Sequence, residues 1–128
     1  MKILGIGVDI IQNNRIKNSI KNHKFRDRIY SKNELKLSVS SKNKIEYFSK
    51  RFAAKEAFAK ALGTGFRNDL NFKDIEIMKD KFGKPYYLKT KKITKIIRKK
   101  FKVKNFNCFL SISDEKEYST AFTIIQSI

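Results

Sequence analysis

Residues 51–65 read RFAAKEAFAKALGTG, and this stretch organises the rest of the chain. Its alanines, leucine, lysines and glutamate favour a helix, and the Gly-Thr-Gly at its end is a typical helix stop. Extended back through residues 44–50, it predicts the longest helix of the chain. At about 100° per residue, apolar side chains cover most of its circumference, so we expect a core helix. Glu56 and Lys60 stand one turn apart on the remaining stripe.

These two charged residues have two interpretations. A carboxylate and an ammonium at i and i+4 commonly form a solvated pair, which adds about 0.2–0.5 kcal/mol to a helix. Alternatively, Glu56 holds a metal ion and Lys60 a phosphate, with the following glycines letting the backbone approach a ligand closely. The stretch alone leaves both interpretations open.

The composition indicates one domain, residues 1–128, with a modest hydrophobic core. Apolar residues make up 41% of the chain, but no apolar run reaches about 18 residues, so we expect no membrane-spanning helix. Asp9 interrupts the apolar N-terminal run, which argues against a signal peptide. The single cysteine, Cys108, excludes an internal disulfide and fits a reducing compartment, so a cytoplasmic location is expected. One histidine and one cysteine cannot build a zinc site within one chain.

The formal net charge of +18 predicts attraction to polyanions. One hypothesis is therefore a small basic nucleic-acid-binding domain. Against it, the phenylalanines follow core periodicity and no recognised nucleic-acid signature is present. Abundant Lys, Asn, Ile and Phe also fit AT-rich coding DNA, which by itself raises the charge. Charge alone selects no partner.

The order of the expected elements predicts an α+β fold: a mostly antiparallel sheet with the long central helix packed on it. Strands are expected at residues 2–8, 73–78, 86–88, 109–113 and 118–125, and helices at 11–20, 24–30, 44–62 and 90–100. A loop is expected at 66–72. Ser31 and Glu34 form a capping-box pattern that opens a further short helix.

Asp9 follows the first strand and its two glycines, Gly5 and Gly7. The glycines permit close packing or close ligand approach. Asp9 is either a helix N-cap or a metal ligand at the strand end. The region after it is basic, with Arg15, Arg26 and Arg28 among few acids, and is either a solvated face or a docking surface for an acidic partner.

Four motifs occur in order: GIGVD at 5–9, FAAKEAFAKALGTG at 52–65, DKFGKP at 80–85 and SISD at 111–114. Together they resemble the small holo-acyl-carrier-protein synthases, which are 4′-phosphopantetheinyl transferases, over residues 3–125. The resemblance implies transfer of 4′-phosphopantetheine from coenzyme A (CoA) to a serine of apo-acyl carrier protein. Adenosine 3′,5′-bisphosphate is released, and the product supports fatty acid biosynthesis.

The resemblance also implies roles for individual residues. Asp9 and Glu56 match the ligands of a Mg²⁺ ion on the CoA diphosphate, and Lys60 matches the residue that meets the phosphate and aids departure of the leaving group. Gly63, Thr64, Gly65, Lys84 and Pro85 match CoA-binding segments.

Partners and chemistry follow from the same resemblance. Arg15, Arg26 and Arg28 match a surface that docks acidic acyl carrier protein, and a homotrimer with active sites between subunits is implied. Two carboxylates on different elements suit Mg²⁺, which takes one or two carboxylates plus phosphates and waters. Positioning and charge stabilisation then supply most of the catalysis. Glu56, directly or through water, is the candidate general base.

One residue departs from the family pattern. Many relatives carry a histidine where this chain has Phe109, and the only histidine here, His23, lies far away in the sequence. A third hypothesis is therefore a chain that keeps the fold and CoA binding but has lost turnover. The neighbouring Cys108 is interpreted as a small core residue rather than a replacement nucleophile.

Overall fold

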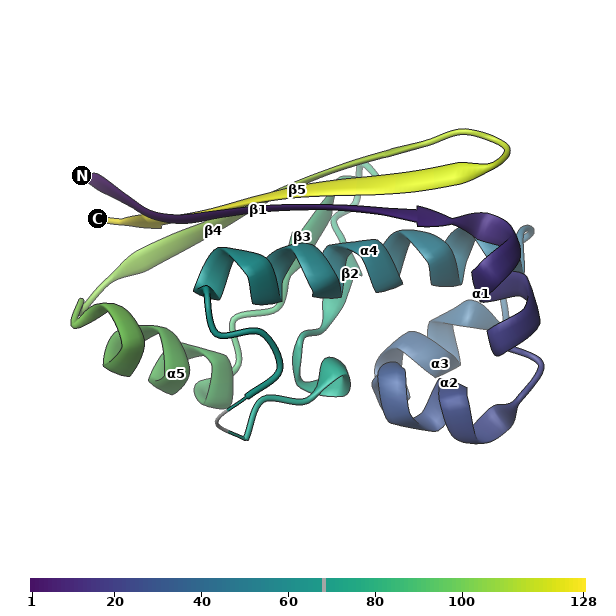
Figure 1. Ribbon diagram of the computed structural model, residues 1–128, viewed down its shortest axis with the longest axis horizontal. Coiled ribbons are helices and arrows are strands. Elements are labelled where there is room, and N and C mark those ends of the chain that lie inside the picture. The colour runs from purple at the N-terminus through teal and green to yellow at the C-terminus, as the bar shows by residue number, and fades with distance from the viewer. Residues whose placement is uncertain (68) are drawn as a thin grey trace.

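The computed structural model describes residues 1–67 and 69–128, and it places one long helix beneath a three-stranded sheet (Figure 1). The α+β class is confirmed, and every strand pairing is antiparallel. None of the helices in the described residues combines the length and the apolar character needed to cross a membrane. The elements in order are β1 (Lys2–Gln12), α1 (Asn13–Ser19), α2 (His23–Ile29), α3 (Lys32–Ser38), α4 (Lys44–Leu62), η1 (Phe72–Asp74), β2 (Ile77–Lys79), β3 (Pro85–Tyr87), α5 (Lys91–Phe101), β4 (Phe106–Asp114) and β5 (Tyr118–Ser127).

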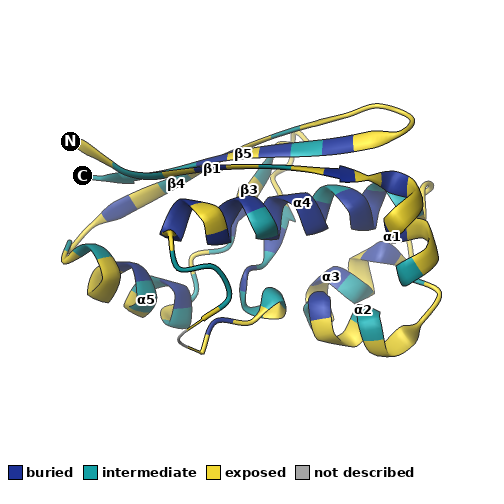
Figure 2. Ribbon diagram, in the orientation of Figure 1, coloured by how far each residue is buried: buried dark blue, intermediate teal, exposed yellow. Residues whose placement is uncertain are grey.

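Helix α4 spans the residues expected for the central helix. The side chain of Asn43 caps its first turn by accepting a hydrogen bond from the backbone N–H of Glu46. Gly63 ends it in the left-handed conformation, with φ of 81°, which glycine adopts without the steric cost of a Cβ. Most of the helix is buried (Figure 2), so its interpretation as a core helix is confirmed.

Strands β1, β5 and β4 form one sheet, with β5 in the centre and β1 and β4 at opposite edges. The first and last strands lie side by side, and Lys2 pairs with Ser127. Side chains alternate between two faces. The inner face packs on α4 and buries Ile11, Ala121 and Ile125, whereas the outer face leaves large apolar side chains exposed.

Gly5 and Gly7 let β1 and α4 approach backbone to backbone. A Cβ at Gly5 would overlap the carbonyl oxygen of Ala61, and one at Gly7 would overlap that of Ala57. Both obstacles are backbone atoms of a buried helix, which cannot move aside as a flexible side chain can. The sequence left close packing and ligand approach open for these glycines, and the structure assigns them to packing.

The first strand is longer than expected, and Asp9 is not a helix N-cap. Strand β1 continues to Gln12, and Ile10 and Gln12 pair with residues of β5. Helix α1 therefore starts at Asn13, later than the predicted residue 11. Continued pairing with a long neighbouring strand overrides the local helical pattern here.

Helix α2 lies within one residue of the expected range 24–30 at each end, and the further short helix expected after Ser31 is α3. The capping box is formed in both directions: Ser31 Oγ accepts from Glu34 N at 3.1 Å, and Glu34 Oε1 accepts from Ser31 N at 2.9 Å. Helix α5 begins and ends one residue later than the predicted range 90–100.

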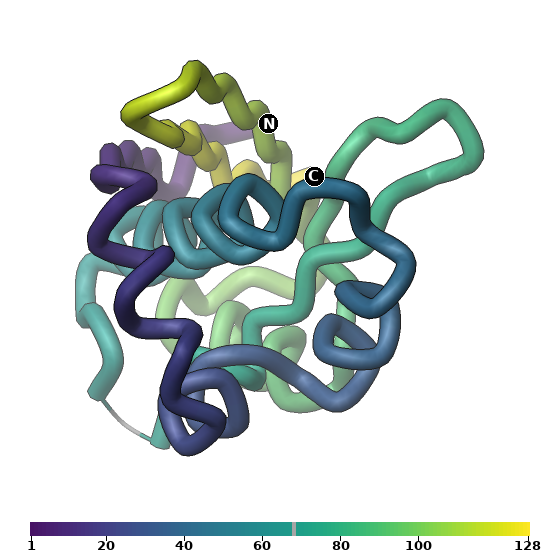
Figure 3. Tube along the Cα trace, turned by 90° about the vertical axis from the view of Figure 1, so that its right-hand side faces the viewer, coloured from purple at the N-terminus to yellow at the C-terminus, as the bar shows by residue number. Residues whose placement is uncertain are grey.

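The strand expected at residues 73–78 is largely wrong. Residues Phe72–Asp74 form a 3₁₀ turn, fixed by a hydrogen bond from Asn71 N to the Asp74 carboxylate at 2.9 Å, and only Ile77 begins a strand. Strands β2 and β3 make a separate two-stranded sheet whose hairpin projects from the body (Figure 3). The loop expected at 66–72 contains Asn68, which lies outside the described residues.

The glycine contacts predict a large effect of one methyl group. We expect Gly7→Ala to lower the free energy of unfolding by about 3 kcal/mol or more, because the added Cβ forces β1 away from α4. Urea denaturation measures the change. Lys2→Ala, on the exposed end of the same strand, is the control and should change stability by less than about 0.5 kcal/mol. Equal effects of the two variants would contradict the packing role of Gly7.

Candidate active site

Asp9, Glu56 and Lys60 come together where the edge strand β1 crosses α4. Asp9 is on the inner face of β1, and its carbonyl oxygen accepts a hydrogen bond from Thr120 Oγ1 at 2.7 Å. The Lys60 ammonium donates to the Val8 carbonyl at 3.0 Å and to Asp9 Oδ1 at 3.2 Å. Lys60 therefore pairs with Asp9 on the strand, and no ion pair joins it to Glu56 within the described part of the chain.

The charges of Asp9, Lys60 and Arg15 all influence the pKa of the Glu56 carboxyl. Partial burial raises the pKa of its carboxyl, and the negative charge of Asp9 raises it further. Lys60 and Arg15 oppose the shift. Two carboxylates that repel each other in a half-buried position form a place where a cation is favourable.

The donor set fits a hard divalent ion. Two carboxylates, from Asp9 and Glu56, offer only oxygen ligands, which is what Mg²⁺ prefers. Among residues 1–67 and 69–128, no group of three or more His, Cys, Asp or Glu side chains could enclose a metal. Such a two-carboxylate site leaves most coordination positions to waters or to phosphate oxygens of a ligand.

The loop after α4 begins beside these charges. Gly63 and Gly65 both have positive φ, of 81° and 62°, and a side chain at either would meet open space rather than protein. Thr64 lies between them, partly buried. The glycines therefore shape the backbone path of this loop and leave its surface uncovered.

The three arginines expected to dock a partner lie on α1 and α2. Arg15 is exposed and close enough to Glu56 to influence its pKa, whereas Arg26 is partly buried and Arg28 is exposed. The basic helical end of the molecule thus adjoins the Asp9–Glu56 pair on the Arg15 side.

Lys84 and Pro85 are not brought to the other candidate residues. They belong to the β2–β3 hairpin, whose strand β3 contacts β4, at the sheet edge opposite to β1 (Figure 3). Strand β5 separates the two edges. Asp9 and Lys84 therefore lie toward opposite edges of the sheet within one chain.

Phe109 and Cys108 also lie away from the Asp9 side chain. Phe109 is 47% exposed on the outer face of the sheet, and Asp9 is on the inner face. Burial raises the pKa of the Cys108 thiol to about 12, which makes it an unreactive group at neutral pH. His23, the only histidine, is exposed at the start of α2.

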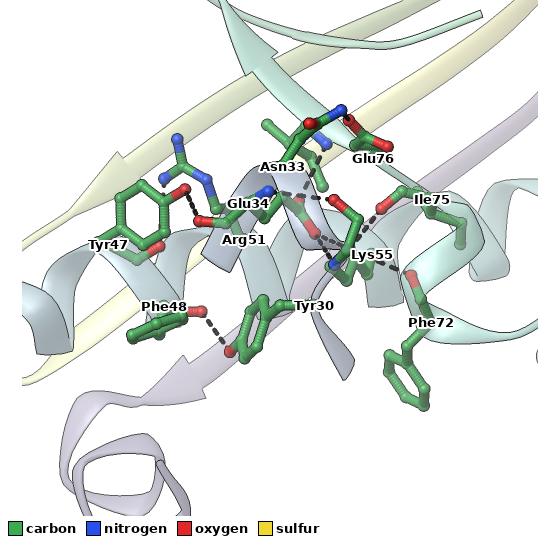
Figure 4. Close-up of polar contacts among 12 residues, drawn as sticks. Tyr30, Asn33, Glu34, Tyr47, Phe48, Arg51, Lys55, Phe72, Ile75 and Glu76 are labelled. Carbon is green, nitrogen blue, oxygen red and sulfur yellow. Dashed lines mark hydrogen bonds and ion pairs between the residues drawn. The ribbon is translucent and has the colours of Figure 1, made fainter. Parts of the chain in front are cut away.

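A buried ion pair at Lys55, the residue before Glu56, holds this part of α4 in place (Figure 4). The Lys55 ammonium lies 2.6 Å from Glu34 Oε1, and both side chains are fully buried. Lys55 also donates to the carbonyl oxygens of Phe72 and Ile75, and Glu34 Oε2 accepts from Ile77 N at 3.0 Å. One ammonium and one carboxylate thus tie together α3, α4 and the segment that leads into β2.

Sequence reasoning missed this pair. Glu34 was explained by its capping box, and Lys55 carried no prediction of its own. The two residues are 21 positions apart, and no local pattern connects them. A lysine inside an otherwise apolar helical face was the only available signal.

Arg51 is a second buried base that carried no prediction. It is 4% exposed, its guanidinium lies 3.5 Å from the centroid of the Tyr47 ring, and Nη1 donates to the Tyr47 carbonyl at 3.2 Å. Its Nε–H has no hydrogen-bond partner among the described residues. Stacking on the ring compensates part of the cost of burying this charge.

Comparison with known proteins agrees with the fold and with these motifs. The chain belongs to the 4′-phosphopantetheinyl transferase superfamily, whose sequence model matches residues 5–123. It is 59% identical over 126 residues to the holo-[acyl-carrier-protein] synthase of Pelagibacter ubique. The alignment covers 98% of each of the two chains.

Solved structures give the same result. A holo-(acyl-carrier-protein) synthase from Bacillus anthracis, in complex with CoA (3′,5′-ADP), superposes with a TM-score of 0.82 at 35% identity over the full length of both chains. The synthase from Neisseria meningitidis has a TM-score of 0.87 at 36% identity, covering 98% of this chain and 99% of that one. The expected family is confirmed, which favours a transfer enzyme over a nucleic-acid-binding domain.

Removing one member of the buried pair should be costly. We expect Glu34→Ala to lower the free energy of unfolding by about 3–5 kcal/mol, because it leaves the Lys55 ammonium buried without its counter-charge. Denaturant titration measures the loss. Asn33→Ala is the matched control, since it breaks only the exposed bond to Glu76 and should cost less than about 1 kcal/mol. A loss for Glu34→Ala no larger than that of the control would show that the pair does not anchor α4.

Proposed function

We propose that this chain transfers the 4′-phosphopantetheine group of CoA to a serine of apo-acyl carrier protein, and thereby supports fatty acid biosynthesis. The observation that carries the proposal is the meeting of Asp9, Glu56 and Lys60 at the crossing of β1 and α4. The carboxylates of Asp9 and Glu56 suit a divalent ion, and the ammonium group of Lys60 suits the diphosphate to which that ion is bound. The family relationship supports the same reaction.

The reaction breaks one bond and forms another at phosphorus. The serine oxygen attacks the β-phosphorus of CoA, and the bond from that phosphorus to the bridging oxygen breaks. The electron pair of the broken bond leaves with adenosine 3′,5′-bisphosphate. The serine proton passes to a base, for which Glu56, directly or through a water molecule, is the candidate.

Asp9 and Glu56 are the residues that would hold Mg²⁺. When bound, the ion neutralises the diphosphate and polarises its oxygens. Lys60 is 55% exposed at its side chain and can turn from Asp9 toward a phosphate on the leaving group. The Gly63–Thr64–Gly65 backbone, uncovered by side chains, lies next in the chain and receives the nucleotide half of CoA.

The basic helices α1 and α2 supply the docking surface for an acidic carrier protein. Arg15, Arg26 and Arg28 lie there, and Arg15 is near enough to Glu56 to act on its pKa. A carrier held by Arg15 therefore presents its serine close to the proposed base. Complementary charge of this kind speeds association and fixes orientation.

The protein acts as a homotrimer of single-domain chains in the cytoplasm. The outer face of the sheet carries Ile6, Val8 and Phe122, which are 60%, 56% and 43% exposed, and Phe109 continues the patch on β4. Apolar patches of this kind mark interfaces. The opposite-edge position of Lys84 and Pro85 supports a site completed by a second subunit, and Phe109 then serves the interface.

The first test is mass spectrometry of apo-acyl carrier protein incubated with the protein, CoA and Mg²⁺. We expect the carrier to gain one phosphopantetheine arm, and a chelator to abolish the gain. Asp9→Asn and Glu56→Gln should each slow transfer by about 100-fold or more, since each removes a metal ligand at similar size. Glu117→Gln, an exposed acid on the β4–β5 turn, should retain the rate.

Several outcomes of that test have distinct meanings. Full activity of the Asp9 and Glu56 variants would contradict the metal site. CoA binding by calorimetry without any transfer would support an enzyme that has lost turnover. The absence of both CoA binding and transfer would contradict the proposed function.

Sedimentation velocity tests the trimer. We expect Phe122→Asp to produce monomers and to abolish transfer, because a charge in the centre of the outer face opposes its burial. Leu37→Asp on α3 is a matched control, since Leu37 is 45% exposed but lies off the sheet, and it should leave the assembly unchanged. A monomeric wild-type protein that is fully active would rule out the shared site.

A further inference from the structure

A groove of about 1070 Å³ lies between α5 and the segment that follows α4. The segment after α4 contributes Thr64, Arg67, Asp69 and Leu70 to the lining. Helix α5 contributes Lys91, Lys92, Lys95, Ile96, Lys99 and Lys100. Helix α5 and this segment lie at the end of α4 opposite to α1 and α2 (Figure 1), so the proposed carrier-docking surface does not account for the groove. The groove shares only Thr64 with the residues of the proposed CoA site.

The wall formed by α5 is crowded with positive charge. Nine of the 16 residues from 89 to 104 are Lys or Arg, and none is Asp or Glu. Lys91, Lys95 and Lys99 follow one another at i, i+4 spacing and line the groove. Like charges at this spacing destabilise a helix, so the row has a cost that an anion would remove.

Little of this charge is neutralised by the protein. Lys92 pairs with Asp74 at 2.7 Å and reaches Asp69 at 4.0 Å. Within the described residues, Lys91, Lys95 and Lys99 have no ion pair within 4.0 Å. The groove therefore offers a row of free ammonium groups that extends about 12 Å along the helix axis.

We propose that this groove is a binding site for an extended polyphosphate anion, either inorganic or carried on a nucleoside. A single phosphate meets only one or two of the ammonium groups, whereas a chain of phosphates meets the row. The concave shape and the apolar floor of Leu70 and Ile96 suit a small ligand.

Other polyanions fit this surface less well. The apolar face of α5 is already buried, with Ile93 and Ile97 at 3% and 0% exposure, so it has no free side to enter a membrane. None of the exposed large apolar side chains in the described part of the chain is on α5, so a stacking platform for single-stranded nucleic acid is missing.

Isothermal titration calorimetry with inorganic tripolyphosphate tests the site, in about 150 mM salt with a chelator and no divalent metal. We expect one equivalent to bind and the double variant Lys95→Gln/Lys99→Gln to bind at least about tenfold more weakly, because two charge-assisted contacts are lost. Lys102→Gln/Lys104→Gln changes the net charge equally outside the groove and should bind like the wild type. Adenosine tetraphosphate in place of tripolyphosphate shows whether a nucleoside adds affinity.

Lys60→Gln separates the groove from the proposed CoA site. Retained binding in this variant supports the groove, whereas loss of binding only in this variant would place the probe in the CoA site and overturn the proposal. If tripolyphosphate bound equally weakly to both double variants, its binding would reflect only the overall positive charge, and this result would also overturn the proposal. Binding of duplex RNA or anionic vesicles through Lys95 and Lys99, without tripolyphosphate binding, would overturn it in favour of a macromolecular partner. Modification of the carrier protein by Lys95→Gln/Lys99→Gln is measured in a separate assay. Failure of the proposed transfer function can then be told apart from failure of tripolyphosphate binding.

Discussion

The close contact between β1 and α4 is the constraint on which the rest of the structure depends. Gly5 and Gly7 remove two side chains from the inner face of the strand, and the α4 backbone at Ala57 and Ala61 fills the space. Asp9 is the next inward position on the strand. Because Gly5 meets Ala61 and Gly7 meets Ala57, Asp9 lies over the preceding turn of α4. The Lys60 ammonium bridges the two elements by bonding to Val8 O and Asp9 Oδ1. Ordinary strand–helix packing with side chains between would hold these groups several ångströms further apart.

Two adjacent charged residues of α4 have different surroundings: Lys55 belongs to the buried structural network, and Glu56 belongs to the candidate active site. Lys55 points into the protein and is fully buried against Glu34. Glu56 stays partly accessible and lies near enough to Asp9 for that charge to raise the pKa of the Glu56 carboxyl. Successive residues on a helix are about 100° apart, so fixing Lys55 fixes the direction of Glu56. The network in Figure 4 also binds the segment around Phe72 and Ile75, where the loop that starts at Gly63 returns to the protein. One rigid set of contacts therefore supports both the carboxylate and the far end of the glycine loop.

The sequence predicted what depends on local periodicity and on recognisable spacing. The bounds of α4, the Ser31 capping box and the separation of helices from antiparallel strands all follow from patterns within a few residues. Contacts between distant residues were not predictable in the same way. The extension of β1 past Asp9 depends on pairing with Ser119 and Thr120, and the turn at Phe72–Asp74 replaces a strand because the Asp74 side chain bonds to Asn71. The site residues Asp9, Glu56 and Lys60 were named from motifs, but the partner of Lys60 and the distance of Lys84 from Asp9 required the tertiary structure. The Lys55–Glu34 pair had no signature in the sequence beyond one lysine on an otherwise apolar helical face.

The pairing of the first strand with the last sets an order of events during synthesis. Strand β5 lies between β1 and β4, and its final residues pair with Lys2 and Ile3. Until the ribosome releases β5, β1 has no neighbouring strand, and the edge that carries Asp9 is held over α4 only by contacts with the helix itself. Contacts of such large sequence separation form late and slow the folding of a domain. A nascent chain in which β5 is not yet available thus lacks the strand pairing that supports Asp9, even when both Asp9 and Glu56 have been made.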